Sequence, residues 1–314
     1  MARIFLTGAT ACVGHYLADV LSAGGQHQLD VLVRDPARLR PVPAQVHLTP
    51  VVGDLADVAP LAPRLRQADY LIHAAAERGG DLERGLQVNV EGTLALLAAL
   101  DPSRVRRVFY FSSASLLRSD GSLVPAELLS DHSYLLSKYR AYVALQASPL
   151  RQRIVTLFPT LVYGWDQNHP PAHDSISLRA LLPWAPVLAR LHLDASFHYI
   201  HAQDIARIVR HLLTLDQSGV ALAGRYVLGN PLVDWRQCVR AFTGRAPRPW
   251  FTVRPQLILR LAALCRIRLS RFDQAAITNP HFDYDTVHSG TFGLPATCAT
   301  FSELLAAHTA KRRA

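Results

Sequence analysis

The sequence predicts an α/β protein in which helices wind over both faces of a parallel sheet, followed by a smaller C-terminal substrate-binding subdomain. Apolar strands alternate with helical segments through residues 1–164, and runs that are apolar throughout are typical of parallel strands buried on both faces. A glycine-bearing loop directly follows the first strand. The 314 residues suffice for one large α/β domain with an appendage.

The pattern of apolar residues assigns the individual elements. Strands are expected at 3–6, 29–33, 46–52, 70–75, 108–112 and 154–158. Helices are expected at 13–23, 58–67, 88–100, 203–215, 234–243 and 255–271, and a further helix, capped by Ser130 or Asp131, carries Tyr134. We therefore assign 1–164, completed by 196–230, to a dinucleotide-binding domain, and 165–195 with 231–314 to the substrate-binding subdomain.

Composition narrows the class of protein. Four cysteines without a C-x-x-C pair indicate neither a disulfide framework nor a zinc site, and they favour the reducing cytoplasm. The N-terminus has no signal-peptide pattern, and no apolar run is long enough to span a bilayer. The formal charge of +9 is spread along the chain without a nucleic-acid-binding motif. We expect no bound metal and no nucleic-acid partner, and the sequence leaves a homodimer open.

The loop from Thr7 to Gly14 has the character of a phosphate-binding turn. Gly8 and Gly14 occupy the outer positions of a G-x-x-G-x-x-G pattern, and Ala11 stands at the middle position. Glycines allow close approach to a pyrophosphate, and the following helix N-terminus attracts its negative charge. At the end of the second strand, Arg34 favours the 2′-phosphate of NADP, whereas the adjacent Asp35 leaves NAD open.

Tyr134 and Lys138 lie four positions apart, on one face of a helix. A neighbouring ammonium would lower the pKa of the phenol from its usual value of about 10, if nothing opposes it. Such a tyrosine could exchange a proton with an alcohol or ketone oxygen near neutral pH. Ser113 precedes the pair by 21 residues, at the end of a strand.

Together these segments resemble the extended short-chain dehydrogenase/reductase family, also called the NAD-dependent epimerase/dehydratase family, whose members have a Rossmann fold. The resemblance rests on segments at 7–14, 53–55, 73–76, 89–93, 111–113, 134–138, 159–164 and 198–204. It implies that Tyr134 is the acid/base, that Lys138 tunes it and bonds the nicotinamide ribose, and that Ser113 holds the substrate oxygen. It further implies cofactor contacts from Gly8, Thr10, Ala11, Cys12, Val13, Gly14, Arg34, Asp54, Leu55, Ala74, Ala75, Asn89, Lys138 and Pro159, with Asn89 favoured as structural rather than catalytic.

Departures from the family pattern indicate the branch. Ala114 and Ser115 replace the acidic pair of 4,6-dehydratases, which disfavours a dehydratase, and Leu161 replaces the asparagine usual in nucleotide-sugar epimerases. Ala11 replaces a glycine, and Phe158 stands where many members have arginine. The leucine-rich segment 255–271 is similar to a helix of the steroid-dehydrogenase-like branch. It could pack on the core, line a pocket or lie on an anionic membrane.

Three functions remain open. The sequence favours an NAD(P)-dependent oxidoreductase, NADP preferred, that interconverts a carbonyl and a secondary alcohol on a small, fairly apolar substrate. A nucleotide-sugar epimerase with tightly bound NAD is the first alternative. A dinucleotide-binding structural or regulatory subunit without turnover is the second, although the chain keeps Ser113, Tyr134 and Lys138, which such a subunit could dispense with.

Overall fold

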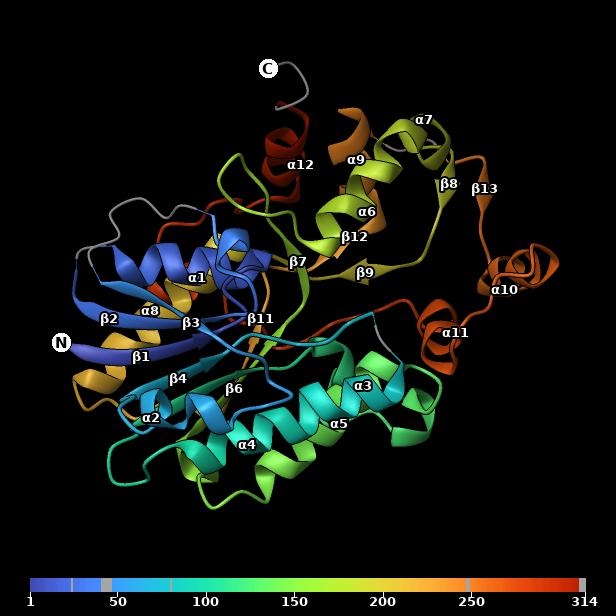
Figure 1. Cartoon of the computed structure of the whole chain (residues 1–314). Helices are drawn as coiled ribbons and strands as arrows, with labels where there is room; N and C mark the ends of the chain where they lie inside the picture. The colour runs from blue at the N-terminus through green and yellow to red at the C-terminus, as the bar shows by residue number, and fades with distance from the viewer. Residues whose placement is uncertain (24, 41–46, 80, 247–248, 311–314) are drawn as a thin grey trace.

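A computed structural model describes residues 1–23, 25–40, 47–79, 81–246 and 249–310. Within these residues, seven parallel strands form one sheet in the order β11-β6-β5-β4-β1-β2-β3 (Figure 1). Their bounds are β1 Ala2–Thr7, β2 His27–Val33, β3 Leu48–Val52, β4 Tyr70–His73, β5 Arg107–Phe111, β6 Ile154–Pro159 and β11 Arg225–Leu228. The predicted doubly wound α/β fold is confirmed. The strand order reverses between β1 and β4, where such folds bind ligands.

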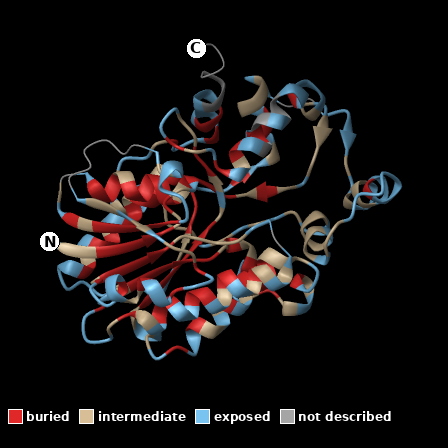
Figure 2. Ribbon diagram, in the orientation of Figure 1, coloured by how far each residue is buried: buried red, intermediate tan, exposed pale blue. Residues whose placement is uncertain are grey.

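Helices cover both faces of this sheet (Figure 1). Helices α1 (Cys12–Ser22) and α8 (Ala202–Gln217) bury one apolar cluster with it. Helices α2 (Ala62–Leu65), α4 (Gly92–Ala99) and α5 (Ser133–Gln146) bury a second cluster on the opposite face. The central strands β1, β2, β4, β5 and β6 are almost wholly buried, as Figure 2 shows, which explains why they read as continuous apolar runs.

Several predicted boundaries were wrong. The helix expected at 58–67 is a 3₁₀ turn followed by the short α2, because prolines at 60 and 63 restrict the backbone. The strand expected at 46–52 begins at Leu48, and Val46 lies outside the described residues. The strand expected at 70–75 ends at His73.

The helix expected to begin at Val88 begins six residues earlier. Asp81 accepts a hydrogen bond from the backbone N–H of Arg84 and starts α3 (Leu82–Leu86). A π-helical segment, Gln87–Glu91, then joins α3 to α4. Helix α5 is capped by His132, whose Nδ1 accepts from the N–H of Leu135 at 3.4 Å, and not by Ser130 or Asp131.

The remaining chain forms smaller elements beside the carboxyl edge of the sheet. The short strands form the pairs β7–β10, β9–β12 and β8–β13. A third apolar cluster joins α6, α9 and α12 to β7 and β10. The bounds are β7 Leu161–Tyr163, α6 His173–Leu181, α7 Ala185–Leu188, β8 Leu191–His192, β9 Ser196–Phe197, β10 Tyr199–His201, β12 Val233–Asp234, α9 Trp235–Thr243, β13 Phe251–Thr252, α10 Pro255–Leu264, α11 Arg271–Thr278 and α12 Phe301–Ala310.

The single helix expected at 255–271 is therefore two helices. Helix α10 ends at Leu264, and Arg266 turns the chain with a φ of 56°. Helix α11 starts anew at Arg271 with a capping box, in which Ser270 and Asp273 exchange hydrogen bonds. Non-glycine residues rarely adopt a positive φ, so Arg266 marks a specific turn at which the two helices separate.

A chain of buried hydrogen bonds joins β1 and β4, on either side of the point where the strand order reverses, to α4 and α5. His73 lies between Thr7, whose Oγ1 is 2.7 Å from Nδ1, and Thr93, whose Oγ1 is 2.8 Å from Nε2. Thr93 donates its own proton to the carbonyl of Asn89, so Nε2 must carry the histidine proton and Nδ1 must accept from Thr7. Burial lowers the pKa of His73 to about 3, which keeps it in this neutral form.

Asn89 continues this chain toward α5. Its side chain accepts from the N–H of Glu77 at 2.7 Å and donates to the carbonyl of Glu77 at 2.9 Å and to Oγ of Ser137 at 2.8 Å. Asn89 thus fastens the segment after β4 to the helix that carries Tyr134.

Asn89→Ala should lower the free energy of unfolding by about 1–3 kcal/mol, because it leaves buried polar partners unsatisfied. Urea denaturation measures this loss. The exposed Asn168 provides a matched control, and Asn168→Ala should change stability by no more than about 0.5 kcal/mol. Equal stabilities of the two variants would contradict the structural role of Asn89.

Candidate functional site: a cavity at the carboxyl ends of the strands

A cavity of about 870 Å³ opens where β1, β4, β5 and β6 end. The loop after β1, the start of α5 and the segments beyond β7 and α11 all contribute to its walls. Nearly all predicted site residues meet there. Those that line the cavity are Gly8, Thr10, Ala11, Cys12, Val13, Gly14, Arg34, Asp54, Leu55, Ala74, Ala75, Ser113, Tyr134, Lys138 and Pro159. Asn89 is buried behind the wall.

The glycine loop brings backbone close to backbone. A Cβ on Gly14 would lie 2.0 Å from the carbonyl oxygen of Gly8, and Gly8 has a φ of 82°. Ala11, in contrast, is an exposed N-cap residue that donates its N–H to the Gly8 carbonyl at 3.0 Å. Helix α1 begins without a side-chain cap, so its first N–H groups can receive a phosphate. These residues fit a dinucleotide.

Arg34 and Asp35, at the end of β2, point to different surroundings. The sequence had left open which of them meets the cofactor. Arg34 is exposed and lines the cavity. Asp35 instead accepts a hydrogen bond from the N–H of Ala37 and starts a 3₁₀ turn, Pro36–Arg38. The arginine is therefore the charged side chain of the two that faces the cavity.

Two contacts fix the position of Lys138 in the cavity wall. Its ammonium donates to the carbonyl of Phe111 at 2.6 Å and lies 4.6 Å from the ring centroid of Tyr110. Ser113 lies at the end of β5, where its Oγ accepts from the N–H of Ser115. The guanidinium of Arg78 lies over the ring of Tyr134, 5.1 Å from its centroid.

Burial governs the protonation of this group. It raises the pKa of Tyr134, and the cation that partly opposes it is Arg78. Burial lowers the pKa of Lys138 to about 7, with a smaller contribution from Arg78. The pKa of the phenol is therefore not lowered as the spacing to Lys138 had suggested for an unopposed ammonium, because burial opposes it and outweighs the attraction of Arg78.

Sequence reasoning missed Arg78, which comes from the segment after β4. A cation directly beyond the carboxyl end of a central strand was the available signal. Asp174 also lines the cavity, and its carboxylate accepts from the N–H of Val162 at 2.7 Å.

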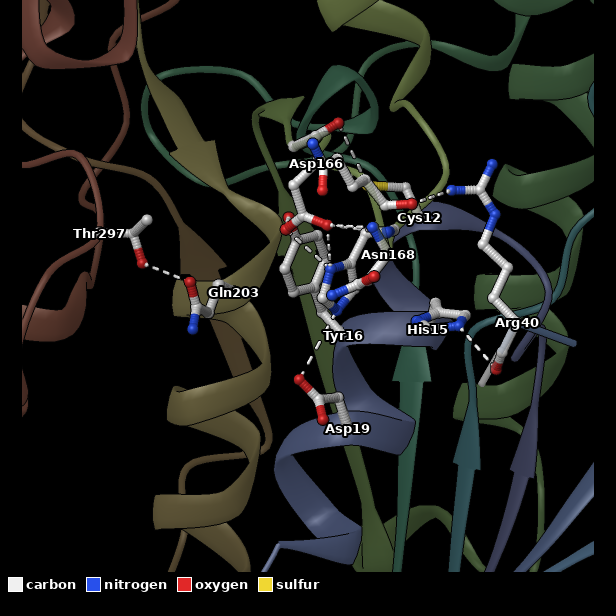
Figure 3. A network of polar contacts seen from close by, with 12 residues as sticks. Cys12, His15, Tyr16, Asp19, Arg40, Asp166, Asn168, Gln203 and Thr297 are labelled. Carbon is white, nitrogen blue, oxygen red and sulfur yellow. Dashed lines mark hydrogen bonds and ion pairs between the residues drawn. The ribbon is translucent and has the colours of Figure 1, made fainter. Parts of the chain in front are cut away.

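A polar clasp holds α1 to the loop after β7 (Figure 3). The hydroxyl of Tyr16 donates to Asp166 at 3.0 Å, and Asp166 also bonds Nδ1 of His169 at 2.8 Å. The rings of Tyr16 and His169 stack with centroids 3.6 Å apart. Cys12, on the same helix, donates its thiol to the carbonyl of Gly164 at 3.6 Å, and burial raises its pKa to about 12. This thiol stays protonated, which agrees with a packing role.

The clasp determines the charge of Asp166. Burial would raise its pKa, but hydrogen bonds from His169 and from the N–H of Asn168 outweigh burial and lower it to about 2. A carboxyl whose pKa falls on folding stabilises the folded state above its unfolded pKa, here 3.8. That stability is lost as the pH falls from about 4 toward 2.

Asp166→Asn should therefore destabilise the protein at pH 6, and the difference from the wild type should shrink as the pH falls below about 4. Unfolding by urea across this range gives the difference directly. Asp57→Asn, which removes an exposed carboxylate outside the clasp, serves as the control for loss of a charge. A gap between Asp166→Asn and the wild type that is constant down to pH 3 would contradict the clasp.

Comparisons with known proteins agree with this geometry. The model of the NAD dependent epimerase/dehydratase family matches residues 4–229. A 3-beta-hydroxysteroid dehydrogenase of Mycolicibacterium neoaurum is 32% identical over 133 residues, which span 40% of this chain but only 35% of that protein. Sterol demethylase protein B of Methylococcus capsulatus is 24% identical over 299 residues, covering 90% and 86% of the two chains.

The fold is also found among solved structures. The Bordetella bronchiseptica enzyme WbmH in complex with NAD+ has a TM-score of 0.65 and 20% identity, covering 100% of this chain and 98% of the other. The family match spans most of the chain, and its region contains the glycine loop, Ser113, Tyr134 and Lys138. The protein thus belongs to the NAD dependent epimerase/dehydratase family and is an enzyme of the extended short-chain dehydrogenase/reductase type.

Proposed function

We propose that this enzyme interconverts a carbonyl and a secondary alcohol on a small, apolar substrate, with NADP as its cofactor. The observation that carries the proposal is the common cavity. Ser113, Tyr134 and Lys138 line the same cavity as the glycine loop. A phenol, a hydroxyl and an ammonium beside a dinucleotide site are the groups that carbonyl reduction needs.

In this proposal each side chain has one task. The nicotinamide, when bound, supplies or accepts the hydride. Tyr134 transfers a proton to the substrate oxygen, and its raised pKa keeps the phenol protonated at neutral pH, ready to donate. The hydroxyl of Ser113 donates a hydrogen bond to the same oxygen. Lys138 bonds the ribose from its fixed position against Phe111.

NADP is favoured over NAD by the charge at the end of β2. Arg34 faces the cavity, whereas Asp35 is engaged by the N–H of Ala37. An arginine here accommodates a 2′-phosphate, and an acid would have bonded the free 2′-hydroxyl.

The apolar side of the cavity supports the substrate class. Leu161, Phe272, Phe282 and Tyr284 line it. Two relatives are named for reactions of steroids and sterols, which are apolar molecules. We assign residues 165–195 and 231–314, which contain His173, Phe272 and Tyr284, to a substrate-binding subdomain.

Tyr134→Phe should reduce turnover by about 10²–10⁴-fold, because it removes the proton donor. NADPH oxidation with a panel of steroid and other apolar ketones measures the rate, and fluorescence titration should give an unchanged Kd for NADPH. Tyr139→Phe, on the same helix but outside the cavity lining, should keep full activity. Turnover retained in Tyr134→Phe would refute the proposed role.

The nucleotide-sugar epimerase alternative makes a different prediction for the purified protein. Such an enzyme should retain NAD through gel filtration, whereas an enzyme that exchanges its cofactor should lose it. Retained NAD together with sugar-nucleotide epimerisation would overturn the proposed reaction.

Arg34→Ala should raise the Kd for NADPH by roughly 10–100-fold, since a hydrogen bond to a charged group contributes about 1.5–3 kcal/mol. The Kd for NADH should stay nearly constant. Arg38, exposed on the neighbouring 3₁₀ turn and outside the cavity lining, is the matched control. A wild-type protein that binds NADH more tightly than NADPH would contradict the cofactor preference.

A further inference from the structure

Residues 250–271, here called the α10 arm, lie at the outer edge of the molecule, away from the sheet (Figure 1). Figure 2 shows that the helix in this arm is largely exposed. Ala262 is the buried residue of α10. The arm therefore does not pack on the core, and it contributes no side chain to the 870 Å³ cavity.

The arm exposes large apolar side chains that a water-facing surface would normally bury. Leu264 is 78% exposed and Trp250 is 71% exposed. Leu257, Leu261 and Leu264 follow a helical spacing, so they form one stripe on α10, opposite Ala262. The exposed apolar side chains of the arm are Trp250, Phe251, Leu257, Leu261, Leu264 and Ile267. A stripe of exposed large apolar side chains on one helix face indicates an interaction surface.

The charges of the arm have a single sign. Five exposed arginines accompany the apolar side chains, and residues 250–271 contain no aspartate or glutamate. The arginines are Arg254, Arg260, Arg266, Arg268 and Arg271. Two copies of the arm would repel each other in a symmetric contact, because the same positive patch would face itself. An anionic surface with an apolar interior complements both features.

Two residues of the arm, Trp250 and Phe251, also line a smaller cavity that contains arginines. This cavity, of about 450 Å³, is lined by Arg236, Arg240, His192, Trp250 and Phe251. The guanidinium of Arg190 lies 5.2 Å from the ring centroid of Trp250. Arginines near an exposed tryptophan are suited to phosphate headgroups at a bilayer surface, where indole rings also concentrate.

We propose that the α10 arm docks this enzyme onto the surface of an anionic phospholipid bilayer. Docking of this kind is superficial: no described helix has the length and apolarity to cross a membrane. The leucine stripe enters the headgroup boundary, and the arginines bind lipid phosphates.

The arm is coupled to the mouth of the active cavity. The backbone N–H of Arg271 donates to the carboxylate of Asp131 at 3.0 Å. Phe272 lines the cavity and packs edge-on against His132, the cap of the helix that carries Tyr134. If the proposed function holds, an apolar substrate dissolved in the bilayer would reach the cavity from this side.

The test is sedimentation of the protein with vesicles, without substrate or cofactor. Vesicles of phosphatidylcholine containing phosphatidylglycerol should carry the protein down, and vesicles of phosphatidylcholine alone should carry little. Arg260→Gln/Arg268→Gln should weaken partitioning about 25-fold, since each arginine near an anionic surface contributes a factor of about five. Leu261→Gln/Leu264→Gln should also lose binding, because the apolar stripe is removed.

The control removes equal charge elsewhere. Arg66→Gln/Arg140→Gln changes exposed arginines outside the arm and should bind vesicles like the wild type. Failure to bind anionic vesicles, or equal weakening of both arginine pairs, would overturn the proposal. A dimer in gel filtration that Leu261→Gln/Leu264→Gln dissociates would also overturn it. Tyr134→Phe should bind vesicles normally, so a failure of the proposed reaction would leave this result intact.

Discussion

The arrangement of the cavity depends on the two hydrogen bonds of the neutral His73 imidazole. The imidazole accepts a hydrogen bond from Thr7 at the end of β1 and donates one to Thr93 on α4. Through Asn89 the same chain of bonds reaches Ser137 on α5. The glycine loop and the helix that carries Tyr134 are therefore joined by short, fully buried bonds, with no flexible charged side chain between them.

Desolvation shifts the pKa values of Tyr134 and Lys138, both on α5, in opposite directions. It favours the uncharged form of both, so the phenol of Tyr134 keeps its proton and the amine of Lys138 holds its proton weakly. The carbonyl of Phe111 and the ring of Tyr110 compensate the ammonium in this dry position. A cation at the cavity wall, Arg78, supplies the attraction that helical spacing had suggested for Lys138.

The sheet and most of the cavity could be predicted from the sequence, because both depend on local patterns. Apolar strands, glycine spacing and a Tyr–Lys pair are all readable within a few residues. Contacts between segments that are distant in the sequence could not be predicted in this way. The π-helical segment around Asn89, the clasp between Tyr16 and Asp166 and the role of Arg78 each depend on packing across the fold. The break in the segment 255–271 occurs at Arg266, whose backbone has a positive φ. An arginine in the sequence gives no sign of such a conformation.

The cofactor loop shows which of its three small residues are replaceable. A methyl group at position 14 would collide with the Gly8 carbonyl, and position 8 needs a left-handed backbone, whereas position 11 is the exposed N-cap of α1 and is occupied by alanine. The backbone therefore requires glycine at positions 8 and 14 but not at position 11. A fingerprint that demands glycine at all three places would overlook this chain, whereas one that allows any small residue in the centre would find it.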